Sequence, residues 1–133
     1  MKNVIKTTAA ALALSATASL ADGMTEGGVA HYAWTEGAFE GEYRITLLPD
    51  GKFRGEGLAG AEKGLDFIQD VYHSSEVSEG IHLISWLETK GNTAGYTVTV
   101  IVDSAGKTVH GVVSNETAHY PLKGALIEFS TGN

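Results

Sequence analysis

Cysteine is absent from this 133-residue chain, and proline occurs only twice. Without cysteine there is no disulfide framework, no thiol nucleophile and no cysteine-ligated zinc or iron–sulfur centre. Basic residues are scarce as well, because nine Lys and Arg stand against 16 Asp and Glu, for a formal net charge of −7. No cluster of Lys or Arg interrupts this acidic excess, so the sequence argues against nucleic acid and anionic membrane surfaces as partners.

The start of the chain has the pattern of a Sec-type signal peptide. A basic segment at residues 1–6 precedes an apolar stretch at 7–20, and the small residues Ser19 and Ala21 follow at the positions that a signal peptidase reads. The apolar stretch is shorter than the roughly 20 residues that span a bilayer. We therefore expect a signal peptide at 1–21, export to a bacterial periplasm without a membrane anchor, and a single soluble domain at 22–133.

Alternating apolar and polar residues dominate the rest of the chain, and the clearest case is residues 39–58. A Pro-Asp-Gly turn in the middle predicts a β-hairpin. Pairing the residues on either side of that turn sets Tyr43 opposite Gly57 and Arg44 opposite Glu56. Because Tyr43 belongs to the more apolar face, we expect Arg44 and Glu56 to form an ordinary cross-strand pair on the outside.

Further hairpins are predicted at residues 70–88 and 95–114, with a closing strand at 125–130. Such a series favours an all-β antiparallel meander, and closing the meander into a small barrel removes its unpaired edges. A two-sheet sandwich remains open as the alternative, as does a short helix within residues 60–69. The side chains expected to face the interior share the apolar side of these strands: Tyr43, Ile45, Leu47, Phe53, Val98, Val100, Ile127 and Phe129.

Three segments carry a resemblance to a known family. They are Gly-Glu-Tyr-Arg-Ile at residues 41–45, Glu-Gly-Leu-Ala-Gly at 56–60 and Ile-Ser-Trp-Leu-Glu at 84–88. Over about residues 37–113 the chain resembles the MoaF-like family of small calycin-type barrels. The resemblance implies a lipocalin-like antiparallel barrel with a central cavity, although the Gly-x-Trp signature of true lipocalins is absent here.

The hairpin at residues 70–88 is the most informative part of the chain for function. If Glu76 pairs with His82, then Tyr72 lies opposite Trp86, and Asp70 lies opposite Glu88 in the same register. Aromatic and acidic side chains then share one face. The other face of the hairpin is also largely apolar, and a loop, a short helix or a second copy of the chain in a homodimer would cover it.

Two interpretations of the aromatic and acidic face remain open. It is either ordinary core packing with acids at the rim, or the wall of a cavity that holds an amine by cation–π and ion-pair contacts. On the second interpretation the ligand-binding residues are Tyr72, Trp86, Glu88, Tyr43 and His82.

Metal and cofactor chemistry finds little support. The five histidines never fall at the spacing of two or four residues that places two ligands on one side of a strand or helix. The glycine-rich stretch at 55–60 lacks the Lys-Ser or Lys-Thr ending of a phosphate loop, and a Gly-x-Ser-x-Gly elbow is missing. The sequence thus predicts a periplasmic small-molecule-binding barrel with no cofactor and no metal. A cofactor-free lyase or isomerase and a structural module with a filled barrel remain the alternatives, and no catalytic residue is assigned.

Overall fold

The computed structural model describes residues 21–70 and 72–132, so the expected signal peptide at 1–21 lies almost wholly outside the described residues. Within this part, all ten strands belong to one antiparallel sheet, and the only helices are single 3-10 turns at Pro49–Gly51 and Gly91–Thr93. None of these described helices is long and apolar enough to cross a membrane. The strands are β1 (Ala21–Asp22), β2 (Val29–Glu36), β3 (Gly41–Leu47), β4 (Phe53–Gly60), β5 (Asp66–Gln69), β6 (Tyr72–Ser78), β7 (Ile81–Leu87), β8 (Thr97–Asp103), β9 (Thr108–Ser114) and β10 (His119–Ser130).

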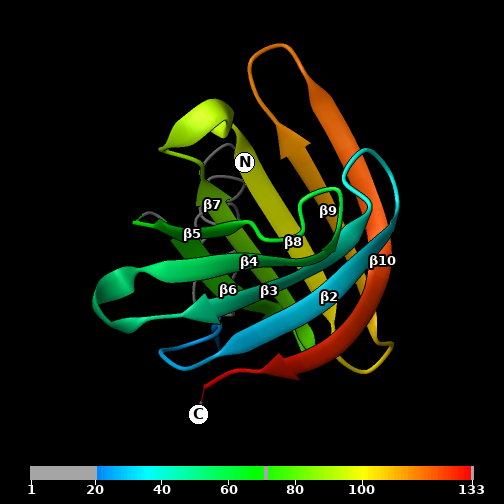
Figure 1. Ribbon diagram of the computed structural model, residues 1–133. Coiled ribbons are helices and arrows are strands. Elements are labelled where there is room, and N and C mark those ends of the chain that lie inside the picture. The colour runs from blue at the N-terminus through cyan, green and yellow to red at the C-terminus, as the bar shows by residue number, and fades with distance from the viewer. Residues whose placement is uncertain (1–20, 71, 133) are drawn as a thin grey trace, which may run out of the picture.

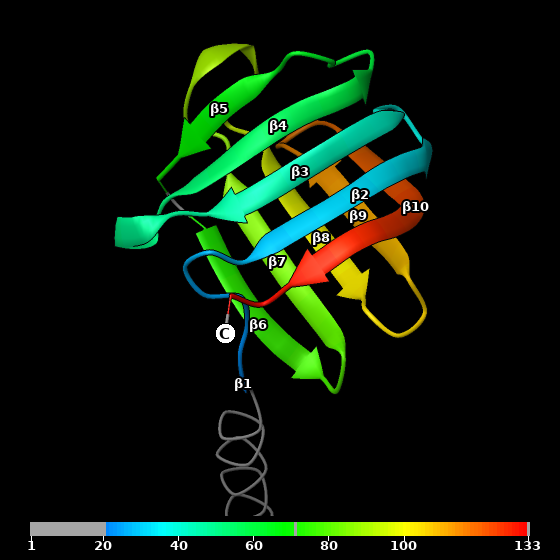
Figure 2. The same cartoon turned by 60° about the horizontal axis from the view of Figure 1, so that its bottom comes forward.

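The sheet curls strongly but does not close. Its strand order is β1-β6-β7-β8-β9-β10-β2-β3-β4-β5, so most neighbours in space are also neighbours in sequence, as the predicted meander requires. Figures 1 and 2 show the resulting half-barrel. The prediction of a closed barrel was wrong, because among the described residues β5 pairs with β4 alone and no ladder joins it to β6.

Aromatic side chains fill the seam between β5 and β6. The ring of Phe53 on β4 lies 6.0 Å from that of Phe67 on β5, 6.0 Å from Tyr72 on β6 and 5.0 Å from Trp86 on β7, between ring centroids. These contacts connect β4 and β5 to β6 and β7 across the seam. Among the described residues, β5 and β6 are thus connected by side-chain packing and not by a backbone ladder.

The predicted register of the first hairpin is confirmed. Tyr43 pairs with Gly57 and Arg44 with Glu56, and the 3-10 turn between β3 and β4 places Asp50 and Gly51 at φ 64° and 70°. Asp and Gly tolerate this left-handed region better than other residues. The turn chemistry therefore sets the pairing from Leu47 back to Tyr43, beyond which a β-bulge between Glu42 and Tyr43 shifts the register by one residue.

The concave face of the sheet holds the core. Five of the expected interior residues are buried, and Tyr43 and Phe129 pack against them while remaining half-buried. Ile127 was predicted wrongly, since 51% of its side chain is exposed. A β-bulge between Leu126 and Glu128 shifts the alternation along β10, so Leu126 faces the interior instead.

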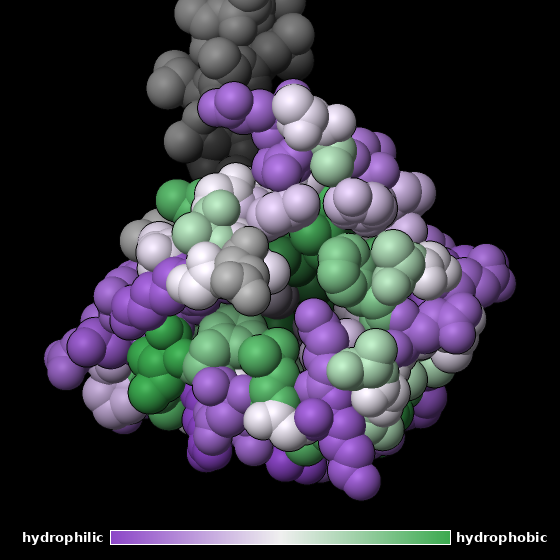
Figure 3. All heavy atoms as spheres, turned by 45° about the horizontal axis from the view of Figure 1, so that its top comes forward, coloured by the Kyte–Doolittle hydropathy of each residue, from purple (hydrophilic) through white to green (hydrophobic). Residues whose placement is uncertain are grey.

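The two ends of the half-barrel differ. At one end the segment before β2 crosses from β6 toward β3 and β10: Met24 is buried, its backbone N–H donates to Ser74 Oγ, and Gly27 N–H donates to Leu47 O. The other end carries the loops at residues 37–40, 61–65, 88–96 and 115–118. Figure 3 shows that this second end, called the open end below, is hollowed, with apolar side chains at the bottom of the hollow.

Candidate functional site

Polar and aromatic side chains from four parts of the chain meet on the concave face near the open end. Tyr32 on β2 and Tyr43 on β3 are direct cross-strand partners, so their side chains share this face, and their rings stack at 6.0 Å with an interplanar angle of 24°. Trp86 and Glu88 come from the end of β7 and the residue that follows it, and Glu62 comes from the turn between β4 and β5. We call these five residues the open-end cluster.

Glu88 is held from two sides. Its carboxylate accepts hydrogen bonds from Trp86 Nε1 at 3.2 Å and from Gln69 Nε2 at 2.5 Å. The side-chain oxygen Oε1 of Gln69 in turn accepts hydrogen bonds from the backbone N–H and the hydroxyl of Thr89. Burial raises the pKa of Glu88, and the charge of Glu62 raises it further, while the two hydrogen bonds act in the opposite direction. The cluster thus contains a carboxyl group that is partly desolvated and oriented by two hydrogen bonds.

Glu62 reaches the cluster because the turn that carries it folds back onto β4. A Cβ atom at Gly57 would lie 2.0 Å from the Glu62 carbonyl oxygen, so only glycine permits this approach. The Tyr43 hydroxyl lies 2.8 Å from Glu62 Oε2 and 3.2 Å from Phe39 O. Burial, followed by the hydrogen bond and the charge of Glu62, raises the pKa of Tyr43 above its ordinary value.

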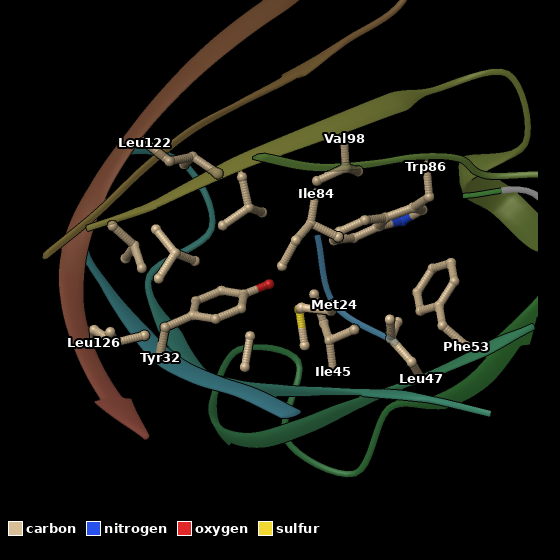
Figure 4. Close-up of a cluster of buried hydrophobic side chains, with 14 of the residues drawn as sticks. Met24, Tyr32, Ile45, Leu47, Phe53, Ile84, Trp86, Val98, Leu122 and Leu126 are labelled. Atoms are coloured by element: carbon tan, nitrogen blue, oxygen red, sulfur yellow. The ribbon is translucent and has the colours of Figure 1, made fainter. Parts of the chain in front are cut away.

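Tyr32 is the most deeply placed member of the cluster. Only 3% of the residue is exposed, and Figure 4 shows its hydroxyl group directed into the middle of the interior. No residue of the described chain makes a hydrogen bond with this hydroxyl. Burial, and then the nearby Tyr43, Glu62 and Glu88, raise the pKa of Tyr32, so the phenol is neutral at physiological pH.

The Tyr32 hydroxyl is not sealed from solvent. Among the described side chains, the one nitrogen or oxygen that is both completely enclosed and without a partner is His82 Nδ1. The Tyr32 hydroxyl also lacks a partner, so it must still border accessible space. This leaves an available hydrogen-bonding group directed into the interior of the half-barrel.

Among the residues that the structure describes, the carboxylates of the cluster have no basic partner. The ion pairs of the described residues are His31–Glu42, Arg54–Glu56, Arg54–Asp66, His82–Glu76 and Lys90–Asp70. None of them includes Glu62 or Glu88. A partly buried carboxylate without a counter-charge is costly, and a cation in the hollow would relieve that cost.

Three of the five residues predicted to bind ligand therefore come together, namely Tyr43, Trp86 and Glu88. Tyr72 does lie opposite Trp86, as predicted, but it packs at the seam against Phe53. The register ends there, and Asp70 does not pair with Glu88: its exposed carboxylate lies 3.8 Å from Lys90 Nζ.

His82 lies apart from the cluster, toward the opposite end of β7. It pairs with Glu76 as predicted, with Nε2 3.4 Å from Glu76 Oε2, and its ring packs 4.7 Å from that of Phe129. On the convex face of the same hairpin, Val77 and Leu87 are 45% and 40% exposed. No loop or helix of the described chain covers them.

Sequence reasoning missed Tyr32, Glu62 and Gln69. A sequence signal for Tyr32 was available, because Ala30, Tyr32 and Trp34 occupy alternate positions along β2. The structure shows that all three are buried. Nothing in the local sequence around Glu62 or Gln69 indicates that they meet the end of β7. Arg44 and Glu56 face outward as expected, but the ion-pair partner of Glu56 is Arg54, at 3.8 Å.

Other features of the described residues lie outside the cluster. A surface hollow of about 270 Å³ lies between the loops at 88–96 and 115–118 and is lined by Ala94, Gly95, Asn115, Glu116 and Thr117. It has no aromatic side chain in its wall. In this part of the chain no three His, Asp or Glu side chains are grouped to hold a metal ion.

No protein-family model matches the chain, and no curated protein matches it. Among solved structures, the chain is similar to the crystal structure of a "putative beta-lactamase" from Burkholderia vietnamiensis. The match has 19% sequence identity and a TM-score of 0.61, and it covers 79% of this chain and 94% of the other. At this identity the similarity shows the fold alone, and the chain is therefore identified as an all-β protein with one curled antiparallel sheet.

Proposed function

We propose that this chain is an exported small-molecule-binding protein whose hollow takes a ligand with a protonated amine. The observation that carries the proposal is the pair of carboxylates, Glu62 and Glu88, that lie beside aromatic rings at the open end without a basic partner. An ammonium group would pair with Glu88 while the apolar part of the ligand contacts Trp86 and the floor of the hollow. The export pattern at residues 1–21 supports a periplasmic location, and the resemblance to the MoaF-like barrels supports a ligand-binding interior.

Calorimetric titration with a matched amine and acid tests this function. 2-Phenylethylamine and 3-phenylpropanoate share their apolar part and differ in the sign of the charge. We expect the amine to bind and the acid to bind at least tenfold more weakly, because the carboxylates attract one and repel the other. Tighter binding of the acid would overturn the proposal.

Two glutamate variants separate the site from the general field of an acidic protein. Glu88→Gln and Glu56→Gln remove the same charge, but Glu56 lies on the convex face. We expect Glu88→Gln to weaken the amine about tenfold or more and Glu56→Gln to leave it within twofold, since a charge-assisted hydrogen bond contributes about 1.5–3 kcal/mol. Equal effects of the two variants would mean that the amine does not bind at the open-end cluster.

One observation favours a second candidate, a cofactor-free lyase or isomerase. The pKa of Glu88 is raised, and the neutral phenols of the open-end cluster lie near it. A raised carboxyl pKa is common among the groups that transfer protons in enzymes. If the protein is such an enzyme, Glu88→Gln abolishes turnover of a bound ligand, which NMR of the ligand would detect. Bound ligand that stays chemically unchanged over hours in the unmodified protein would argue for binding alone.

A further inference from the structure

The Tyr32 hydroxyl makes no hydrogen bond to any residue that the structure describes. Its ring packs 4.9 Å from that of Trp34 and 6.0 Å from that of Tyr43, and a phenylalanine ring would make the same contacts. The hydroxyl adds a polar group to a residue that is only 3% exposed, and no described residue bonds to it. Because no described residue completes a hydrogen bond with this hydroxyl, the bond is available to water or to an occupant of the hollow.

The direction of the hydroxyl agrees with such an occupant. It points into the middle of the interior, away from the sheet that carries it (Figure 4), and it borders accessible space. The carboxylates of Glu62 and Glu88 come from the turn after β4 and the end of β7, nearer the open end. A molecule that enters there with its charged group at the carboxylates would direct its other end toward Tyr32.

The chemistry of the inner group follows from the surroundings. A second cation at that depth would have no carboxylate of its own, and an anion would be repelled by Glu62 and Glu88, whose charges already raise the pKa of Tyr32. The neutral phenol instead donates a hydrogen bond to an uncharged oxygen. An inner hydroxyl or carbonyl group on the ligand meets this requirement.

We infer that the site recognises a two-ended molecule, with an ammonium group at Glu88 and an uncharged oxygen at its inner end that accepts a hydrogen bond from Tyr32. Tyr32 is then a specificity-determining residue that selects among amines. This inference rests on the proposed amine-binding function and deepens it.

Two pairs of amines that differ by one hydroxyl test the inference. Benzylamine is compared with 4-hydroxybenzylamine, and 2-phenylethylamine with tyramine. The two pairs place the hydroxyl at two different distances from the ammonium group. Calorimetry on the unmodified chain is expected to show, in at least one pair, about two- to tenfold tighter binding of the hydroxylated amine. In Tyr32→Phe, which keeps the ring and loses only the hydroxyl, this preference is expected to disappear.

Two further variants make the result specific. Glu88→Gln should weaken both members of a pair by the same factor and preserve their ratio, because it acts on the ammonium end. Tyr120→Phe removes the hydroxyl of a tyrosine that is 36% exposed and should change neither affinity. Binding of the amines with a ratio that Tyr32→Phe leaves unchanged, or with no preference for the hydroxylated member in either pair, would overturn this inference alone. Failure of all four amines to bind would overturn the proposed function as well.

Discussion

Replacing Phe53 with alanine tests whether side-chain packing holds the open seam together. Phe53 is 1% exposed and makes ring contacts with Phe67, Tyr72 and Trp86, which bridge from β5 to β6 and β7. A buried Phe→Ala change costs about 3–5 kcal/mol through lost transfer free energy and the cavity left behind. Because three aromatic contacts are lost together, we expect about 4 kcal/mol, a large share of the 5–15 kcal/mol typical of a domain.

Urea unfolding followed by circular dichroism measures this loss, with Ile68→Ala as the control. Ile68 lies on β5 close to the seam, but 45% of it is exposed, so its truncation should cost about 0.5 kcal/mol. Hydrogen exchange adds a local readout: in Phe53→Ala the β5 amides should exchange faster, because β5 has only β4 as a ladder partner. A cost for Phe53→Ala below about 1.5 kcal/mol, or equal to that of Ile68→Ala, would refute the idea that the aromatic rings close the seam.

Three other outcomes are expected. In urea unfolding, Leu126→Ala should cost about 2–3 kcal/mol and Ile127→Ala about 0.5 kcal/mol, and the reverse order would mean that β10 has no bulge. Gly51→Ala should cost about 1 kcal/mol, because residue 51 has a positive φ. Gly57→Ala should cost clearly more, because the new Cβ atom would collide with the turn at 61–65. Equal costs for the two variants would contradict this close approach. The raised pKa of Glu88 means that the folded state holds this proton longer than the unfolded state, so the free energy of unfolding should fall as pH rises above the ordinary value of 4.5 toward the raised pKa. Stability measured across this range should lose that slope in Glu88→Gln, and an unchanged slope would assign it to another group.

The sequence by itself determined the local architecture. A Pro-Asp-Gly turn leaves few ways to pair its flanking strands, so the register of Tyr43 with Gly57 follows from local chemistry. The period of two along each strand likewise determines which residues share a face, and most of the expected interior residues are indeed buried. The same alternation failed at Ile127, because one extra residue in a bulge reverses every side chain beyond it and leaves little trace in composition.

The candidate site followed only in part from the sequence. Hairpin pairing placed Tyr72 opposite Trp86, since both belong to one local unit. The meeting of Tyr32, Glu62 and Gln69 with the end of β7 depends on the curl of a ten-stranded sheet and on a turn folded over Gly57, and neither is a property of neighbouring residues. Whether the sheet closes was also decided by tertiary structure, because the rings around Phe53, and no ladder among the described residues, connect β5 to β6. Local pattern thus determined strands, turns and faces, while the balance of long-range packing determined the shape of the hollow and which side chains it brings together.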